Sequence, residues 1–313
     1  MKAKFIKSIL TKKINEWIES IEDEEVKKLV KNNTIVTGGA IVNLLLNEEV
    51  KDYDVYFTNK ETVKAVAKYY VKKFQETRMD NYSSIIVVDG IDVFNGVLNG
   101  SNSPSEVLDT TPDRIKIVIK SAGVAAENAE VIQEPFEDVC DALEELTDKE
   151  EVTKTKYRPV FLSPNAITLS DKVQLVIRFY GDADKIHENY DFVHCTNYFE
   201  YHNKNLVLRP QALEAILTKE LLYIGSKYPI CSIIRTRKFI KRGWNINAGQ
   251  YLKMLYQVSK LDLNDINVLR DQLIGVDSAY FNHLIDALQS KNDVENSFEL
   301  NYTYLATIID RIF

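Results

Sequence analysis

The feature that most constrains the fold is the stretch TIVTGGAIVNLLLNEEVKDYDVYF at residues 34–57. A short apolar segment, TIVT, leads into Gly38 and Gly39, and the apolar run GAIVNLLL begins at the second glycine. The segment DYDVYF then alternates polar and apolar residues, so we predict a strand, a tight turn, a short helix and a second strand. Glycine at the turn permits close backbone approach, and the N–H groups at the start of a helix attract phosphate.

Two aspartates, Asp52 and Asp54, lie at i and i+2 in the second predicted strand. Their side chains are expected to leave the same face, roughly 7 Å apart along the strand. Such carboxylates repel each other unless a cation lies between them, and a pair of Mg²⁺ ions is the usual solution in phosphoryl transfer. Oxygen-only ligands favour Mg²⁺ over softer metals. A solvated strand edge would explain an isolated Asp-x-Asp, but the combination with the glycine turn is far more specific.

Composition restricts the class of protein. The chain has 313 residues, 45% of them hydrophobic, which can supply a sizeable core. Its net charge of -7 argues against general coating of nucleic acid, although a local basic patch is compatible with it. Cys140, Cys195 and Cys231 are widely spaced and form no CxxC, which argues against a disulfide framework or a structural zinc site. We found no apolar run of about 20 residues and no signal-peptide pattern, so we expect a cytoplasmic protein.

The order of predicted elements gives an α+β class. Residues 1–33 are expected to form helices that pack on a head at 34–225, which contains a mixed sheet with flanking helices and an insertion at about 80–156. A helical C-terminal region follows at 226–313. Within the head, NAITLSDKVQLVIRF predicts a hairpin, DFVHCTNYFEY a strand, and QALEAILTKELLYIG a helix closed by Gly225.

The stretch GGAIVNLLLNEEVKDYDVYF resembles the head of the polymerase-beta-type nucleotidyltransferase superfamily, most of all its poly(A) polymerase and tRNA CCA-adding branch. The two glycines and the two aspartates match that branch, whereas its Arg-Asp positions hold Val42 and Asn43 here. The wider pattern, in RFYGDADKIHENYDFVHCTNYFEY and SKYPICSIIRTRKFIKRGW, is similar to nucleotidyltransferase-like proteins of large bacterial viruses. Similarity of this kind transfers a fold more securely than a reaction.

The resemblance implies a third carboxylate near the Asp-x-Asp pair. The segment NYDFVHC resembles the family's Arg-Asp-Phe-Thr stretch and places this acid at Asp191. Asp92 is the competing candidate, because the family also has a hairpin soon after its Asp-x-Asp. We favour Asp191, since the predicted hairpin immediately before it fits the family better. Asp52 and Asp54 would then hold two Mg²⁺ ions, and Asp191 would share one of them and help to deprotonate the attacking hydroxyl.

A second cluster of charge is the segment IIRTRKFIKRGW at residues 233–244. Arg235, Lys238 and Arg242 share one face of a predicted helix, where they could contact phosphate or nucleic acid. A solvated basic face is the alternative. The segment also resembles the Arg-x-x-Arg-Phe helix of CCA-adding enzymes, whose basic side chains read the incoming base. His194 is expected to be packed rather than to bind zinc.

These observations predict a Mg²⁺-dependent nucleotidyltransferase. It would move a nucleoside monophosphate from a nucleoside triphosphate such as ATP to a hydroxyl on an RNA 3′ end such as that of tRNA, on a protein or on a small molecule. If the chain is encoded by a virus, its place is the host cytoplasm, with no membrane partner. The alternative is a non-catalytic binding or structural protein with the same fold, which the missing Arg-Asp pair and the acidic insertion favour and the retained glycines and aspartates oppose.

Overall fold

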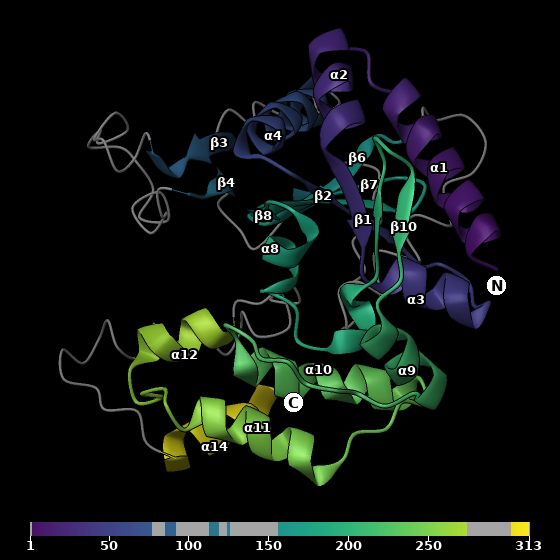
Figure 1. The fold of residues 1–313 in the computed structure, drawn as a ribbon. Coiled ribbons are helices and arrows are strands. Elements are labelled where there is room, and N and C mark those ends of the chain that lie inside the picture. Colours follow the sequence, from purple (N-terminus) through teal and green to yellow (C-terminus); the bar gives the residue numbers. More distant parts are fainter. Residues whose placement is uncertain are drawn as a thin grey trace, which may run out of the picture.

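The predicted α+β class is confirmed: a mixed sheet carries helices on both sides and is followed by a helical C-terminal region (Figure 1). A computed structural model describes residues 2–76, 85–91, 113–118, 124–125, 156–273 and 302–312. In Figure 1 the sheet and its covering helices form the upper part of the molecule, and the C-terminal helices lie beneath them.

Within these residues the main sheet has eight strands, in the order β10-β9-β1-β2-β8-β7-β6-β5. Neighbours are antiparallel except β2 and β8, which run parallel. The strands are β1 (Thr34–Thr37), β2 (Tyr53–Phe57), β5 (Val124–Ala125), β6 (Pro159–Leu162), β7 (Ala166–Leu169), β8 (Val173–Tyr180), β9 (Tyr198–Glu200) and β10 (Asn205–Val207). The predicted hairpin is β7–β8, and the predicted strand, turn, helix and strand are β1, α3 (Gly39–Leu46) and β2.

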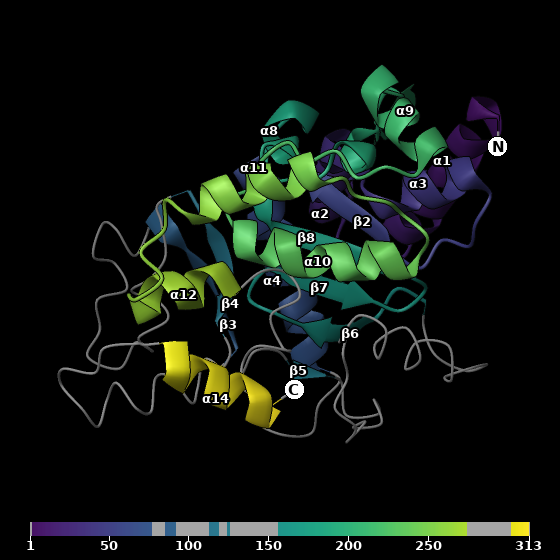
Figure 2. The same cartoon turned by 90° about the horizontal axis from the view of Figure 1, so that it is seen from below.

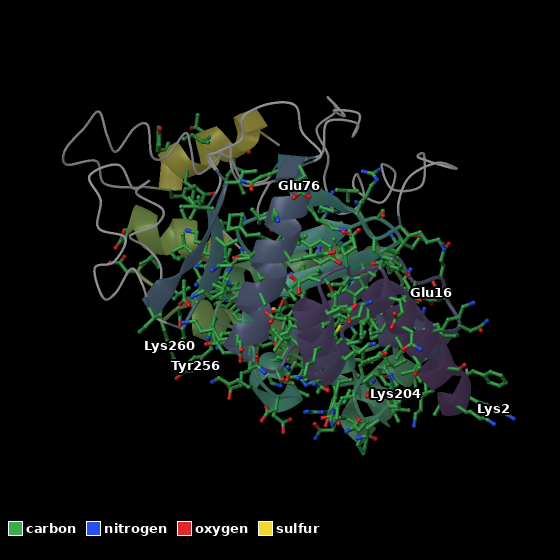
Figure 3. All side chains as sticks on the ribbon, turned by 90° about the horizontal axis from the view of Figure 1, so that it is seen from above. Lys2, Glu16, Glu76, Lys204, Tyr256 and Lys260 are labelled. Carbon is green, nitrogen blue, oxygen red and sulfur yellow. The ribbon has the colours of Figure 1, made fainter. Side chains whose placement is uncertain are left out.

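One face of the sheet is covered by α1 (Ala3–Glu19), α2 (Glu24–Asn33) and α4 (Lys60–Glu76). The apolar side of the N-terminal helices shares the main core with the central strands. The buried stripe of α1 meets the inward residues of the central strands in the main core, and Trp17 of α1 donates to the hydroxyl of Tyr70 on α4 at 2.8 Å. Figure 3 looks onto this face, where Lys2 and Glu16 of the N-terminal segment point outward.

The opposite face of the central strands is free of these helices. Because strand side chains alternate, Tyr53, Val55 and Phe57 enter the main core, so the residues between them point to the other side. There Tyr56 packs in a smaller cluster with Val176 of β8, beneath α8 (Ala183–His187). This face carries the candidate site.

The C-terminal region contains α9 (Pro210–Thr218), α10 (Pro229–Lys241), α11 (Ala248–Val258), α12 (Ile266–Leu273) and α14 (Tyr302–Ile312). Figures 1 and 2 together place α10 directly beneath the sheet, with α11 packed against it. A second apolar cluster joins α3 to this region through Val42, Phe192 and Trp244. It holds the helical region against the head.

Two predicted elements are wrong. The segment 191–201 was expected to be one strand, but it forms the 3-10 helix η1 (Val193–Thr196) before the short strand β9. The predicted helix that Gly225 would close ends at Thr218, where Lys219 adopts a left-handed conformation with φ 50°. In both segments apolar residues pack against neighbouring helices in irregular backbone, which periodicity does not reveal.

The predicted insertion lies partly outside the described residues. Strands β3 (Ile86–Asp89) and β4 (Ile115–Val118) form a separate two-stranded sheet, whereas β5 joins the main sheet. Asp92, Cys140 and the predicted acidic helix lie outside the part of the chain that is described. No helix among the described residues is both long and apolar enough to cross a membrane.

Candidate functional site

A cavity of about 290 Å³ opens between the lower end of the central strands, the start of α3 and one side of α10. It contains every residue that the sequence predicted for the site, although these come from segments far apart in the chain. The predicted residues that line it are Gly38, Gly39, Asp52, Asp54, Asp191, Arg235, Lys238 and Arg242.

The glycine turn forms one wall of this cavity. Gly38 has φ 88° and ψ -147°, a conformation open essentially to glycine alone, and its N–H donates to the carbonyl of Cys195 at 3.2 Å. A Cβ at Gly38 would lie 3.0 Å from Oδ2 of Asp54 and 3.4 Å from the hydroxyl of Tyr190. A Cβ at Gly39 would meet nothing within 4 Å. Gly38 is therefore required by the fold, while Gly39 leaves open space over the N-terminus of α3.

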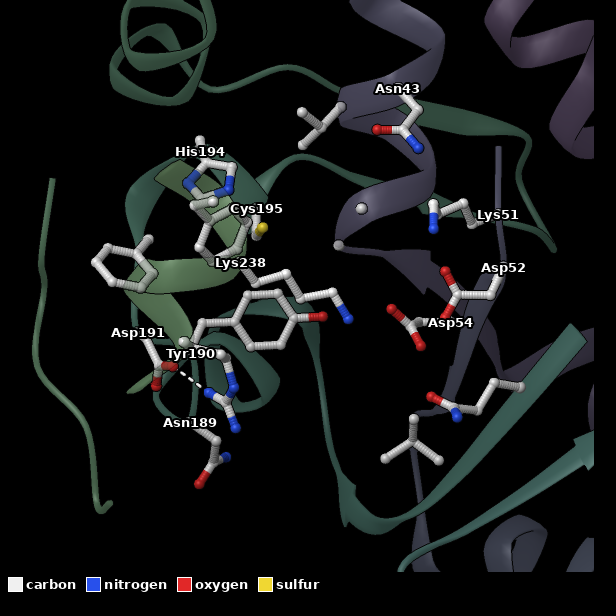
Figure 4. A pocket seen from close by; sticks show the side chains of 18 of the residues that line it. Asn43, Lys51, Asp52, Asp54, Asn189, Tyr190, Asp191, His194, Cys195 and Lys238 are labelled. Atoms are coloured by element: carbon white, nitrogen blue, oxygen red, sulfur yellow. Dashed lines mark hydrogen bonds and ion pairs between the residues drawn. The ribbon is translucent and has the colours of Figure 1, made fainter. Parts of the chain in front are cut away.

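The two aspartates stand at the entry to β2, a central strand of the sheet. Figure 4 shows the carboxylates of Asp52 and Asp54 directed into the cavity, with Lys51 beside them. In the parallel pairing of β2 with β8, Asp54 stands in register with Gln174, which also lines the cavity. The residue of β8 that pairs with Asp54 therefore carries an amide and not a carboxylate.

Asp191 lies on the opposite wall (Figure 4). It precedes η1 rather than standing on a strand, is buried, and forms an ion pair with Arg235 of α10. Within the described residues no group of three His, Cys, Asp or Glu side chains is arranged to hold a metal ion. The structure therefore brings Asp52 and Asp54 together but does not add Asp191 to them as a shared ligand. Asp191 instead fixes a guanidinium.

Helix α10 presents its basic face to the cavity. Pro229 occupies the first turn of the helix, where its missing N–H costs nothing, and Ser232 and Thr236 face the protein interior. The spacing i, i+3, i+7 then brings Arg235, Lys238 and Arg242 to the cavity. In Figure 4 the ammonium of Lys238 points across the cavity towards Asp54.

Aromatic rings close the end of the cavity near η1. The ring of His194 lies 4.3 Å from that of Trp244 and 4.9 Å from that of Phe239, measured between centroids. Burial lowers the pKa of His194 to about 3, so the ring is neutral, and its Nδ1 finds no hydrogen-bond partner among the described residues. The expectation that His194 is packed is confirmed. Burial, reinforced by the charge of Asp54, also holds the pKa of Tyr190 well above its usual range.

Sequence reasoning missed several residues that line the cavity. Lys51 directly precedes Asp52, and strand alternation on β8 would have indicated Gln174 and Arg178 once the hairpin was recognised. Arg178 hydrogen-bonds Tyr228 at the start of α10, with its guanidinium 4.7 Å from the ring. Tyr228 had no sequence signal, because only the fold brings it to β8.

Comparison with solved structures finds tRNA-processing proteins at low similarity. A tRNA-processing enzyme with CTP has 14% identity and a TM-score of 0.34, with 90% of this chain and 60% of that chain covered. A Thermotoga maritima CCA-adding enzyme complexed with tRNA has 10% identity and a TM-score of 0.35, with 90% and 54% covered. A tRNA nucleotidyltransferase complexed with a primer tRNA and an incoming ATP analog has 12% identity and a TM-score of 0.33, with 90% and 65% covered. At these TM-scores no residue roles are transferred.

Comparison by sequence identifies a viral relative. "Gabija anti-defense 2" of Bacillus phage SPbetaL7 is 23% identical over 118 residues, which span 37% of this chain and only 29% of that protein. A family model, described as the Gabija anti-defense 2 family, matches residues 8–219. This match includes the glycine turn, both aspartates of the pair and Asp191, and it extends over more than half of the chain. The chain belongs to the Gabija anti-defense 2 family.

Proposed function

We propose that this protein is a divalent-metal-dependent nucleotidyltransferase that binds a nucleoside triphosphate in the cavity and transfers its nucleoside monophosphate to a hydroxyl. The observation that carries the proposal is that the N-terminus of α3 opens onto the same cavity as the carboxylates of Asp52 and Asp54. The first supplies N–H groups for phosphate, and the second supplies oxygen ligands for a metal.

The donor set suits Mg²⁺. This ion is commonly held by one or two carboxylates, with water and substrate phosphates completing its shell. Asp52 and Asp54 would hold it, and when bound it would neutralise charge on the phosphates and on the leaving group. Asp191 does not belong to this set, because its carboxylate pairs with Arg235.

The residues of the chain would mainly position the nucleotide. The N-cap residue of α3, Gly38, has no side chain to cap the helix, and the open space at Gly39 lets phosphate approach the N–H groups of the first turn. Lys238, directed towards Asp54, would contact phosphate from the other wall. Tyr190 keeps its proton at neutral pH, so its hydroxyl can donate a hydrogen bond beside Asp54 and Gly38. Such placement and charge neutralisation provide most of the catalysis in phosphoryl transfer.

A second candidate function is nucleotide binding without transfer. Gln174, rather than a carboxylate, stands in register with Asp54, and Asp191 is engaged by Arg235. The cavity would then hold the metal and nucleotide but lack a third acid to accept the proton of the attacking hydroxyl. An assay that measures nucleotide binding and nucleotide transfer separately distinguishes the two candidate functions.

The test uses purified protein, Mg²⁺, each α-labelled nucleoside triphosphate in turn, and cellular RNA plus protein as acceptors. We expect label to appear on one acceptor class with the wild type and to disappear with Asp52→Asn/Asp54→Asn. The matched control is Glu24→Gln/Glu25→Gln, an exposed acid pair on α2 that lies on the other side of the sheet. Transfer retained by the aspartate variant would overturn the proposal, and metal-dependent binding without any transfer would establish the second candidate.

The proposed biological role is the suppression of a bacterial defence, as the family description suggests. We expect expression of the wild type to restore phage plating on cells that carry the Gabija defence, and the Asp52→Asn/Asp54→Asn variant, at equal abundance, to fail. Full restoration of plating by the variant would show that suppression of the defence does not depend on this cavity. The acceptor of nucleotide transfer would then be unrelated to the defence.

A further inference from the structure

The end of the cavity beside α3 carries an excess of negative charge. Its lining there includes Glu48, Asp52 and Asp54, and Lys51 is the cation that this wall contributes among the described residues. Figure 4 shows the ammonium of Lys51 directed into the space between the α3 ribbon that carries Asn43 and the carboxylate of Asp52. A phosphate group over the start of α3 would therefore face a wall that carries both the carboxylates and the ammonium of Lys51.

The loop that presents Lys51 is anchored at several points. Asn47 ends α3 in a left-handed conformation, and the N–H of Glu48 donates to the carbonyl of Asn43 at 2.8 Å. The side-chain amide of Asn43 donates to the carbonyl of Glu49 at 2.9 Å. Side-chain ion pairs add to these contacts: Glu49 lies 2.7 Å from Lys172, and Glu48 lies 3.4 Å from Lys219. These contacts, all made by residues 47–49, order the loop that leads to Lys51.

The other cations of the cavity come from different walls. Arg235 is paired with Asp191, Arg178 contacts Tyr228, and Lys238 and Arg242 belong to α10. For a nucleotide whose phosphates reach the N-terminus of α3, the terminal phosphates would lie on the side of the cavity that Lys51 lines. Since a triphosphate is more negative than a monophosphate, a cation on this side discriminates between them by charge.

We propose that Lys51 binds the terminal phosphates of the nucleotide and thereby makes the cavity selective for triphosphates over monophosphates. This inference rests on the proposed function for the identity of the ligand. In this proposal the 47–51 loop serves to position Lys51 beside the aspartate pair. Asn43 and Val42 then serve the architecture, the first through the loop and the second through apolar packing.

The experiment is a calorimetric titration of the full chain with ATP, ADP and AMP in the presence of Mg²⁺. For Lys51→Met, which keeps the length of the side chain but not its charge, we expect affinity for ATP to fall about tenfold and affinity for AMP to change less than about twofold. Lys51→Arg should retain most of the ATP affinity. Lys12→Met, at an exposed position of α1, is the matched control for loss of one positive charge.

The outcomes separate this inference from the proposed function. Equal losses for ATP and AMP, or no loss, would overturn the role of Lys51 whether or not the wild type transfers nucleotide. A selective loss of ATP affinity in a protein that shows no transfer would support Lys51 while removing the transferase. Failure of the wild type to bind any of the nucleotides would overturn both.

Discussion

The two walls of the cavity are built by different kinds of interaction. The wall formed by α3 and β2 is set by backbone geometry. The conformation of Gly38 sets the start of α3, and the alternation of side chains along β2 directs Asp54 into the cavity. The wall formed by η1 and α10 is set by side chains from distant segments, with the Asp191–Arg235 ion pair and the packing of His194 against Trp244 at its centre. The first wall should therefore fail through backbone strain, and the second through loss of paired or packed side chains.

The largest effect is expected from the wall that depends on backbone. Gly38→Ala forces an L residue into a conformation open essentially to glycine and places a Cβ 3.0 Å from Oδ2 of Asp54. We expect a loss of about 3 kcal/mol in the free energy of unfolding, together with loss of Mg²⁺–nucleotide binding. Chemical denaturation and calorimetric titration measure the two effects.

Gly39→Ala is the matched control for this wall. Its Cβ meets nothing within 4 Å, and alanine favours the helix by about 1 kcal/mol, so stability should be unchanged or raised. Nucleotide binding should nevertheless weaken, because the methyl group occupies the space where phosphate would approach. Equal destabilisation by the two variants would show that the special conformation of Gly38 is not what holds this wall.

The same contrast explains which parts could be predicted from sequence. The strand, glycine turn, helix and Asp-x-Asp strand are local, so periodicity and turn chemistry predicted these elements correctly. Helix α10 was found equally well, and its i, i+3, i+7 spacing indicated which cations share a face. Each wall of the cavity thus had a readable local signal.

What sequence could not supply was the partner of each charged group. Asp191 was interpreted as a third metal ligand, but tertiary packing of η1 against α10 brings it to Arg235 instead, 44 positions along the chain. The strand predicted around it was also wrong, because apolar residues of a buried 3-10 turn imitate a strand pattern. The parallel pairing that places Gln174 opposite Asp54 joins segments far apart in sequence and has no local signature.

A smaller effect is expected from the wall that depends on side chains. Arg235→Met leaves the buried carboxylate of Asp191 without its ion-pair partner and should lower the free energy of unfolding by about 2 kcal/mol. Asp191→Asn should cost less, because the amide can still accept a hydrogen bond and Arg235 is the more exposed partner.

A double-mutant cycle gives the decisive measurement for this wall. The combined variant Asp191→Asn/Arg235→Met should be more stable than the sum of the single effects predicts, since neither charge is then left alone. Arg242→Met, on the same face of α10, is the control and should leave stability nearly unchanged. Strict additivity in urea unfolding would mean that the pair does not hold η1 to α10.

The effect that is smallest near neutral pH is a pH dependence to which His194 of the side-chain wall contributes. The pKa of His194 is lowered by burial to about 3, so between this value and about 6.5 the unfolded chain binds a proton that the folded chain excludes. The contribution of His194 to stability must then fall as pH falls through that window, by about 1 kcal/mol for each pH unit.

His194→Phe keeps an aromatic ring beside Trp244 and removes the titrating group, so it should flatten the slope of unfolding free energy against pH below about 6.5. His202→Gln, at an exposed position outside the cavity, is the matched control for replacing a histidine. A slope that His194→Phe does not alter would show that the ring is already hydrated in the folded protein, and the aromatic end of the cavity would then be open to water rather than sealed by packing.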